Sequence, residues 1–158
     1  MDETQGIQVL RQKYPNEITV GFTGTRDSMV IEQWRQVQRI MVALFVDRTG
    51  EFHDGDCIGA DDQAYNVVPK HIRKVGHPCN LPKYRVFNEH DHTHPISPPL
   101  VRNRVIVRSS NVMIAAPKEY EEQFKGSGTW ATIRYARRAK KPLFIVWPDA
   151  TVSVEIEM

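Results

Sequence analysis

Two glycine-containing turns in the sequence have residue types that could bind a phosphate group. The first, Gly24-Thr25-Arg26, follows a run of β-branched and aromatic residues and precedes an amphipathic segment. The second, Gly126-Ser127-Gly128-Thr129, also opens a segment compatible with a helix. Backbone N–H groups at a helix N-terminus favour negative charge, glycine lets a ligand approach the backbone, and arginine offers a planar fork to phosphate oxygens. The two turns therefore predict a site for a phosphorylated ligand.

A third motif, Asp54-Gly55-Asp56-Cys57-Ile58-Gly59-Ala60-Asp61, places acids and glycines at a turn between a strand and a helix. Asp54, Asp56 or Asp61 could activate a water molecule, and Asp56 and Asp61 could bind sugar hydroxyls. The structural alternative is that Asp56 caps the helix and Asp61 lies in its first turn, where a carboxylate is stabilised with or without a ligand. The residue types leave both interpretations open.

Two further groups of polar residues have a functional and a structural interpretation. Arg102-Asn103, at the start of a short helix, could contact a phosphate or a base, or form a surface ion pair. His90, His92 and His94 alternate, so in an extended chain they share one side and could hold a transition metal. A proline-flanked loop is a poor cage for a metal, however, so we expect solvated histidines, no metal and no cofactor.

The second glycine turn does not match the common nucleotide-binding motifs. No lysine follows Gly128, as a P-loop would require, and the spacing is not that of the dinucleotide fingerprint GxGxxG. Conventional nucleoside triphosphate hydrolysis and dinucleotide binding are therefore poorly supported.

The elements that must position these residues alternate along the chain. Strands are predicted at 17–23, 72–77, 111–116 and 142–147, and residues 51–56 are predicted to be a short strand that runs into a turn. Helices are predicted at 30–46, 59–71, 100–108 and 127–139. This order predicts a Rossmann-like α/β fold, a doubly wound and mostly parallel sheet of five or more strands with helices on both faces. Ligands in such sheets lie beyond the carboxyl ends of the strands. Both glycine turns open onto one crevice if the first and fourth strands are neighbours.

The segments outside this pattern set the expected domain organisation. Residues 17–148 form one domain, residues 1–16 an irregular or weakly helical arm, and residues 149–158 a tail that could add an edge strand. Residues 78–99 contain five prolines and are expected to form a long connection, such as a functional loop or lid.

Composition restricts the partners and the compartment. A net charge of +2 does not by itself indicate nucleic-acid binding, and two cysteines without CxxC spacing predict neither a disulfide nor a zinc site. No apolar run reaches the about 18 residues of a membrane span, and the acidic N-terminus lacks the features of a secretory leader. We therefore expect a cytoplasmic, reduced protein with no membrane partner.

Five ordered motifs resemble the SLOG superfamily, Rossmann-like domains that include the Lonely Guy nucleotide phosphoribohydrolases and the Smf/DNA-processing protein A domains. The motifs are Phe22-Thr23-Gly24-Thr25-Arg26, the segment from His53 to Asp61, Arg102-Asn103, Ala115-Ala116-Pro117 and Gly126-Ser127-Gly128-Thr129-Trp130. The resemblance implies a nucleotide or nucleotide-derived ligand at the Gly24 and Gly128 loops. It adds Gly55, Gly59, Ala60 and Pro117 to the expected ligand-binding residues, and analogy implies a homodimer.

One position departs from the Lonely Guy pattern. Thr132 stands where those enzymes carry a glutamate tied to catalysis, and a threonine cannot act as a carboxylate base near neutral pH. The first hypothesis is therefore a domain that senses or sequesters a nucleotide-derived ligand. The alternatives are an N-glycosidic-bond hydrolase that uses an aspartate of the 54–61 turn, and a single-stranded DNA-binding module, which the small net charge does not favour.

Overall fold

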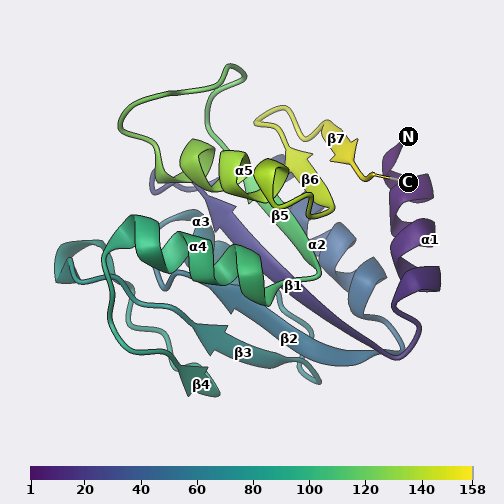
Figure 1. The fold of residues 1–158 in the computed structure, drawn as a ribbon, viewed down its shortest axis with the longest axis horizontal. Helices are drawn as coiled ribbons and strands as arrows, with labels where there is room; N and C mark the ends of the chain where they lie inside the picture. The colour runs from purple at the N-terminus through teal and green to yellow at the C-terminus, as the bar shows by residue number, and fades with distance from the viewer. Residues whose placement is uncertain (158) are drawn as a thin grey trace.

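The computed structural model describes residues 1–157, which form a seven-stranded sheet in the order β4-β3-β2-β1-β5-β6-β7 (Figure 1). All neighbouring strands are parallel except β6 and β7. The strands are β1 (Glu17–Gly24), β2 (Thr49–Asp54), β3 (Arg73–Gly76), β4 (His92–Thr93), β5 (Val112–Ala116), β6 (Leu143–Val146) and β7 (Val152–Glu155). The helices are α1 (Glu3–Lys13), α2 (Ile31–Phe45), α3 (Ala60–Tyr65), α4 (Pro99–Ser109) and α5 (Gly128–Arg138), with a 3-10 turn, η1 (Pro82–Tyr84). The predicted α/β fold class is confirmed.

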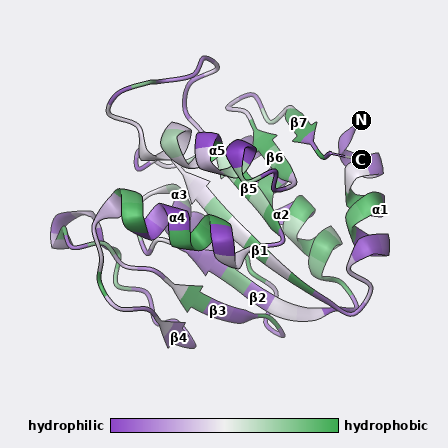
Figure 2. Ribbon diagram, viewed as in Figure 1, coloured by the Kyte–Doolittle hydropathy of each residue, from purple (hydrophilic) through white to green (hydrophobic). Residues whose placement is uncertain are grey.

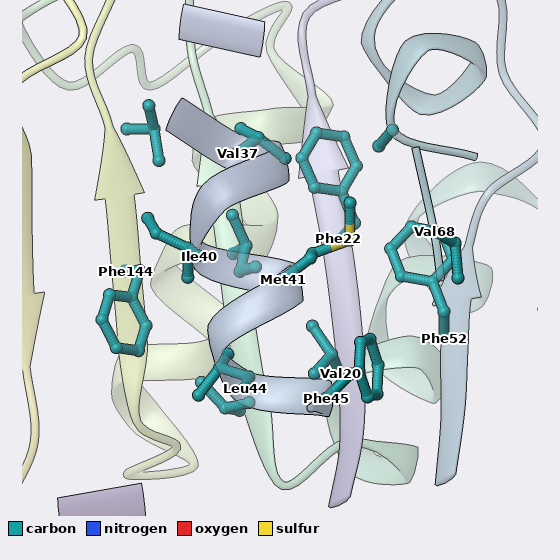
Figure 3. Close-up of a cluster of buried hydrophobic side chains, with 14 of the residues drawn as sticks. Val20, Phe22, Val37, Ile40, Met41, Leu44, Phe45, Phe52, Val68 and Phe144 are labelled. Carbon is teal, nitrogen blue, oxygen red and sulfur yellow. The ribbon is translucent and has the colours of Figure 1, made fainter. Parts of the chain in front are cut away.

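Helices cover both faces of the sheet. Helices α1, α2 and α3 pack on one face, and α4 and α5 pack together on the other (Figure 1). The apolar stripe of α2 lies against β1, β2 and β6 (Figure 3). Its members are Val37, Ile40, Met41, Leu44 and Phe45, and they meet Val20, Phe22, Phe52 and Phe144. Full burial of each such side chain contributes about 1.5–3 kcal/mol, so this contact holds the sheet on that side.

The strands and helices differ in how much of their surface they bury. Every residue of β5 is buried, as expected for a central parallel strand covered on both faces. Helix α4 instead alternates hydrophilic and hydrophobic bands (Figure 2), and its buried residues include the polar pair Arg102 and Asn103. No helix within residues 1–157 combines the length and apolar character needed to cross a membrane.

The N-terminal arm, expected to be irregular or weakly helical, contains the regular helix α1. Asp2 caps α1 by accepting from Gln5 N at 2.8 Å, and the Gln5 side chain accepts from Asp2 N at 2.9 Å. Leu10 is fully buried, and Gly6 lies against the side chain of Val154 in β7. The reciprocal cap and this packing explain why the segment is ordered although its apolar content is low.

One predicted helix boundary was wrong, and the long connection contains regular structure. Helix α3 ends at Tyr65 rather than at residue 71, because Pro69 has no N–H to donate and restricts the residue before it. The connection 78–99 contains η1 and the two-residue strand β4, which pairs with β3 at the edge of the sheet. The tail forms β7, as the pattern in residues 152–156 predicted.

Candidate functional site

A cavity of about 830 Å³ lies at the carboxyl ends of the central strands. Strands β1 and β5 are neighbours, with Gly24 opposite Ala116, so the turns that follow them both border this cavity. The prediction of a shared crevice is therefore confirmed. The volume lies within the range of about 300–1,000 Å³ that is usual for small-molecule sites.

Most of the expected site residues line the cavity. These are Gly24, Thr25, Arg26, Gly55, Asp61, Arg102, Asn103, Gly126, Ser127, Gly128 and Thr129. Asp54, Asp56, Gly59, Ala60 and Pro117 do not line it.

The turn before α5 presents backbone amides to the cavity. The Ser127 hydroxyl caps the helix by accepting from Trp130 N at 3.1 Å. Within residues 1–157 the amides of Gly128 and Thr129 have no hydrogen-bond partner, as is usual for the first residues of a helix. Gly126 has a φ of +73°, and no atom lies within 4 Å of the position that a Cβ would take. The start of α5 is therefore an open, positively polarised surface.

The turn after β1 is held by backbone hydrogen bonds on both sides. Thr25 N donates to Ala116 O at 3.1 Å, and Thr25 O accepts from Ala60 N at 2.9 Å. The Thr25 hydroxyl accepts from Asp27 N at 3.1 Å. Arg26 is exposed, and its guanidinium carbon lies 4.0 Å from the centre of the Tyr84 ring. The turn is thus held in place, and it brings two charges to the cavity, those of Arg26 and of Asp27, the second of which is paired with Lys118.

Arg102 ties three segments together beneath the cavity. Its Nη1 donates to Gly55 O at 2.6 Å and to His77 O at 3.1 Å, and its Nε donates to Asn103 Oδ1 at 2.6 Å. Only 7% of the residue is exposed, so the alternative of a surface ion pair is excluded. Arg102 positions the turn after β2, and it leaves Nη2 as the guanidinium nitrogen without a recorded protein partner in the described chain.

We expect Arg102→Met to lower the free energy of unfolding by about 3 kcal/mol, because two buried carbonyl oxygens lose their donor. Urea denaturation measures this loss. Arg104→Met on the exposed face of the same helix is the control, and it should change stability by less than about 0.5 kcal/mol. Equal losses in the two variants would contradict the positioning role of Arg102.

Asp61 is the buried carboxylate that borders the cavity. Its Oδ2 accepts from Gly55 N at 3.0 Å and from Cys57 N at 3.2 Å. Burial and the nearby charge of Asp54 raise the pKa of Asp61 to about 7, although Arg102 and the two amides oppose the shift. A carboxyl group that titrates near neutral pH in a cavity has the property required of a general acid or base.

Asp54 and Asp56 instead anchor the β3–β4 connection. Asp54 Oδ2 lies 2.9 Å from His90 Nε2, and Asp54 Oδ1 accepts from Asp56 N at 2.6 Å. Asp56 Oδ2 accepts from Nε and Nη2 of Arg85, both at 3.1 Å, and its Oδ1 accepts from Asn88 N at 3.0 Å. The carboxylates of this acidic turn therefore point to two different places, Asp61 to the cavity and the other two to the connection.

Thr132 lies in the first turns of α5 and does not line the cavity. It is 1% exposed, and its hydroxyl donates to Gly128 O at 2.8 Å. Trp130 is buried as well and donates to Glu119 Oε1 at 3.2 Å, so it anchors the helix rather than stacking on a base.

Histidines cluster at the far edge of the sheet, outside the cavity. His53 Nδ1 and His77 Nε2 are 2.7 Å apart, and His94 stacks on His77 with ring centres 4.1 Å apart. Within residues 1–157 no group of three or more His, Cys, Asp or Glu side chains has the geometry to hold a metal ion. His90 binds Asp54, and burial of its ring is outweighed by the hydrogen bond and charge of Asp54, which raise the pKa of His90.

Several cavity residues were not recognised in the sequence. They include Tyr84, Lys118, Phe124 and Tyr135, which line the cavity from the β3–β4 connection, the β5–α5 loop and α5. Lys118 forms an ion pair with Asp27 at 2.6 Å across the rim. The sequence gives only a weak indication that these residues belong to a site. Tyr84 is an aromatic residue among prolines, and Phe124 is a phenylalanine in a charged loop.

Solved structures share this fold, whereas no protein-family model and no curated protein sequence matches the chain. DNA processing protein A from Helicobacter pylori, which binds single-stranded DNA, matches with a TM-score of 0.56 and 19% identity over 90% of this chain and 67% of that chain. The molybdenum cofactor binding protein from Rippkaea orientalis matches with a TM-score of 0.58 and 20% identity over 84% of this chain and 77% of that chain. The chain therefore shares its fold with DNA processing protein A and with the molybdenum cofactor binding protein, which is the α/β fold that the resemblance implied.

Proposed function

We propose that the protein binds a nucleotide, or another nucleotide-derived phosphorylated compound, in the cavity at the carboxyl ends of β1 and β5. The observation that carries this proposal is the convergence of two phosphate-binding features. The unpartnered amides of Gly128 and Thr129 and the guanidinium of Arg26 border one cavity. A sensing or sequestering role is favoured because a buried threonine, Thr132, stands where the Lonely Guy enzymes carry a catalytic glutamate.

Arg26→Ala tests the phosphate assignment. We expect the variant to bind adenosine monophosphate about tenfold or more weakly, because a charge-assisted hydrogen bond contributes about 1.5–3 kcal/mol. Binding of adenosine should change by less than about threefold, because that ligand has no phosphate. Isothermal titration calorimetry measures both affinities.

Arg35→Ala is the matched control, since Arg35 is exposed on α2 and does not line the cavity. It should bind both probes as the unmodified protein does. Equal losses of adenosine and adenosine monophosphate in Arg26→Ala would argue against phosphate at this turn.

Hydrolysis of a nucleotide N-glycosidic bond is the second candidate, and Asp61 is the observation that favours it. Its carboxyl group borders the cavity and has a pKa of about 7, so a large share is ionised near neutral pH and could accept a proton from water. Incubation with nucleoside monophosphates and nucleotide sugars, followed by chromatography for free base, tests this candidate. Release of no base, or equal release by Asp61→Asn, would remove it.

Single-stranded DNA is the third candidate, and it comes from the Helicobacter pylori protein of the same fold. The net charge of +2 provides little of the electrostatic attraction on which such binding usually depends. A salt-dependent mobility shift tests it, and no binding at low salt would eliminate it.

A further inference from the structure

Two of the aromatic residues that border the cavity, Tyr84 and Phe124, each have an arginine of the cavity wall beside the ring. The guanidinium carbon of Arg26 lies 4.0 Å from the centre of the Tyr84 ring, and that of Arg134 lies 5.6 Å from the centre of the Phe124 ring. All four residues line the cavity. A planar group bound there would therefore lie near two aromatic rings, and aromatic rings stack on nucleobases.

The two rings approach the cavity from opposite sides of β1. Tyr84 lies in the connection after β3, on the β2 side of β1, whereas Phe124 lies in the loop after β5, on the other side. In Figure 1 both segments project beyond the carboxyl ends of the strands. A ligand above the end of β1 would therefore lie between the two segments that carry Tyr84 and Phe124.

Tyr84 is held in place by its backbone. Its carbonyl accepts from Ile58 N at 2.9 Å, and its amide donates to Leu81 O at 3.0 Å. The next residue, Arg85, binds Asp56 with two donors. The backbone that carries the ring is thus held before a ligand arrives, which reduces the entropy that binding must overcome.

Phe124 combines an anchored backbone with an exposed ring. Arg134 Nη1 donates to Gln123 O at 2.9 Å and lies 3.2 Å from Glu122 Oε2, so α5 holds the loop next to Phe124. The residue is nevertheless 76% exposed, and no aromatic ring within residues 1–157 stacks on it. Tyr120 in the same loop differs, because its ring stacks on Trp147 with centres 6.0 Å apart.

We propose that Tyr84 and Phe124 form an aromatic clamp for a planar heterocycle, while the phosphate of the same ligand lies at the amides of Gly128 and Thr129. This inference rests on the proposed function and narrows it to nucleotides, excluding phosphorylated sugars without a base. Stacking depends on the flat face that all bases share, so the clamp accepts purines and pyrimidines alike.

Calorimetric titration with adenosine monophosphate, cytidine monophosphate and ribose 5-phosphate tests the clamp. We expect both nucleotides to bind at least about tenfold more tightly than ribose 5-phosphate, since each stacked ring contributes about 1–3 kcal/mol. Tyr84→Leu with Phe124→Leu should remove most of this advantage and leave the affinity for ribose 5-phosphate unchanged. Tyr120→Leu is the control, because Tyr120 is exposed in the same loop and does not line the cavity.

The outcomes separate the clamp from the proposed function. Equal binding of ribose 5-phosphate and the nucleotides, or an unchanged nucleotide affinity in the folded double variant, would overturn the clamp and leave phosphate binding intact. Binding of none of the three probes would overturn both. Binding of a single-stranded oligonucleotide but of no mononucleotide would overturn the assignment to a mononucleotide. The Phe124→Leu single variant keeps the test valid if Tyr84→Leu impairs folding, since the Phe124 side chain is mostly in solvent.

Discussion

Gly59→Ala is expected to lower the free energy of unfolding by about 4 kcal/mol and to weaken ligand binding at the Arg26 turn. Gly59 has a φ of +88°, a conformation that costs an alanine about 1–2 kcal/mol. A Cβ there would lie 2.7 Å from Thr25 O and would also meet the carbonyl of Arg26, so the backbone must shift, at a further cost of about 1–3 kcal/mol. Because Ala60 N donates to Thr25 O, this shift moves the turn that carries Arg26.

Gly126→Ala is the matched control for this prediction. Gly126 also has a positive φ, +73°, but nothing lies within 4 Å of an added Cβ, so only the backbone strain of about 1–2 kcal/mol is expected. Urea denaturation of both variants, with titration of adenosine monophosphate, measures the difference. Similar losses of stability in Gly59→Ala and Gly126→Ala would show that the clash with the turn after β1 does not add to the destabilisation.

His77 is expected to make the protein less stable in acid. Burial and the neighbouring His53 and His94 lower the pKa of His77 from 6.5 to about 3. Between these two values the unfolded chain binds a proton that the folded protein does not, so stability falls as the pH falls from 6.5 to about 3. One such proton changes the free energy of unfolding by about 1.4 kcal/mol per pH unit, or about 5 kcal/mol over the window.

Protonation of Asp61 has the opposite effect on stability in acid, so the experiment must separate the contributions of His77 and Asp61. Its pKa is raised to about 7 in the folded protein from 3.8, so the folded state binds the extra proton and gains stability as the pH falls through this window. Urea denaturation of His77→Gln at several pH values isolates the histidine contribution. We expect a smaller loss of stability on acidification than in the unmodified protein.

His71→Gln is the control for the acid effect, since His71 is exposed and lies outside the histidine cluster. It should keep the pH dependence of the unmodified protein. The same pH dependence in His77→Gln as in the unmodified protein would contradict the role of His77.

The sequence predicted the fold because strong local patterns determine most of its elements. The period of α2 and the β-branched runs of β1 and β5 bury on the faces that their spacing indicates. The failures were at weak or interrupted patterns. Helix α1 depends on a cap and on contacts with β7, and the end of α3 depends on a proline that the apolar positions around it obscured.

The candidate site divides in the same way. The glycine turns were recognised because their residue types act locally, at the ends of β1 and at the start of α5. The directions of Asp54, Asp56 and Asp61 were not predictable, since each depends on a partner that is distant in the sequence or on burial against another element. Tyr84 and Phe124 line the same cavity because of the order of the strands in the sheet, and the spacing of the motifs in the sequence does not reveal that order.

The edge of the sheet at β4 has a consequence for solubility. An open strand edge offers unpaired amides and carbonyls on which strands of other molecules can grow into aggregates. Here the edge strand is two residues long, and just before it the carboxylate of Asp91 accepts from Lys74 N at 2.7 Å, where a longer strand would have paired with β3. This short, charged border leaves little template for intermolecular pairing, so fibril growth from that side is disfavoured.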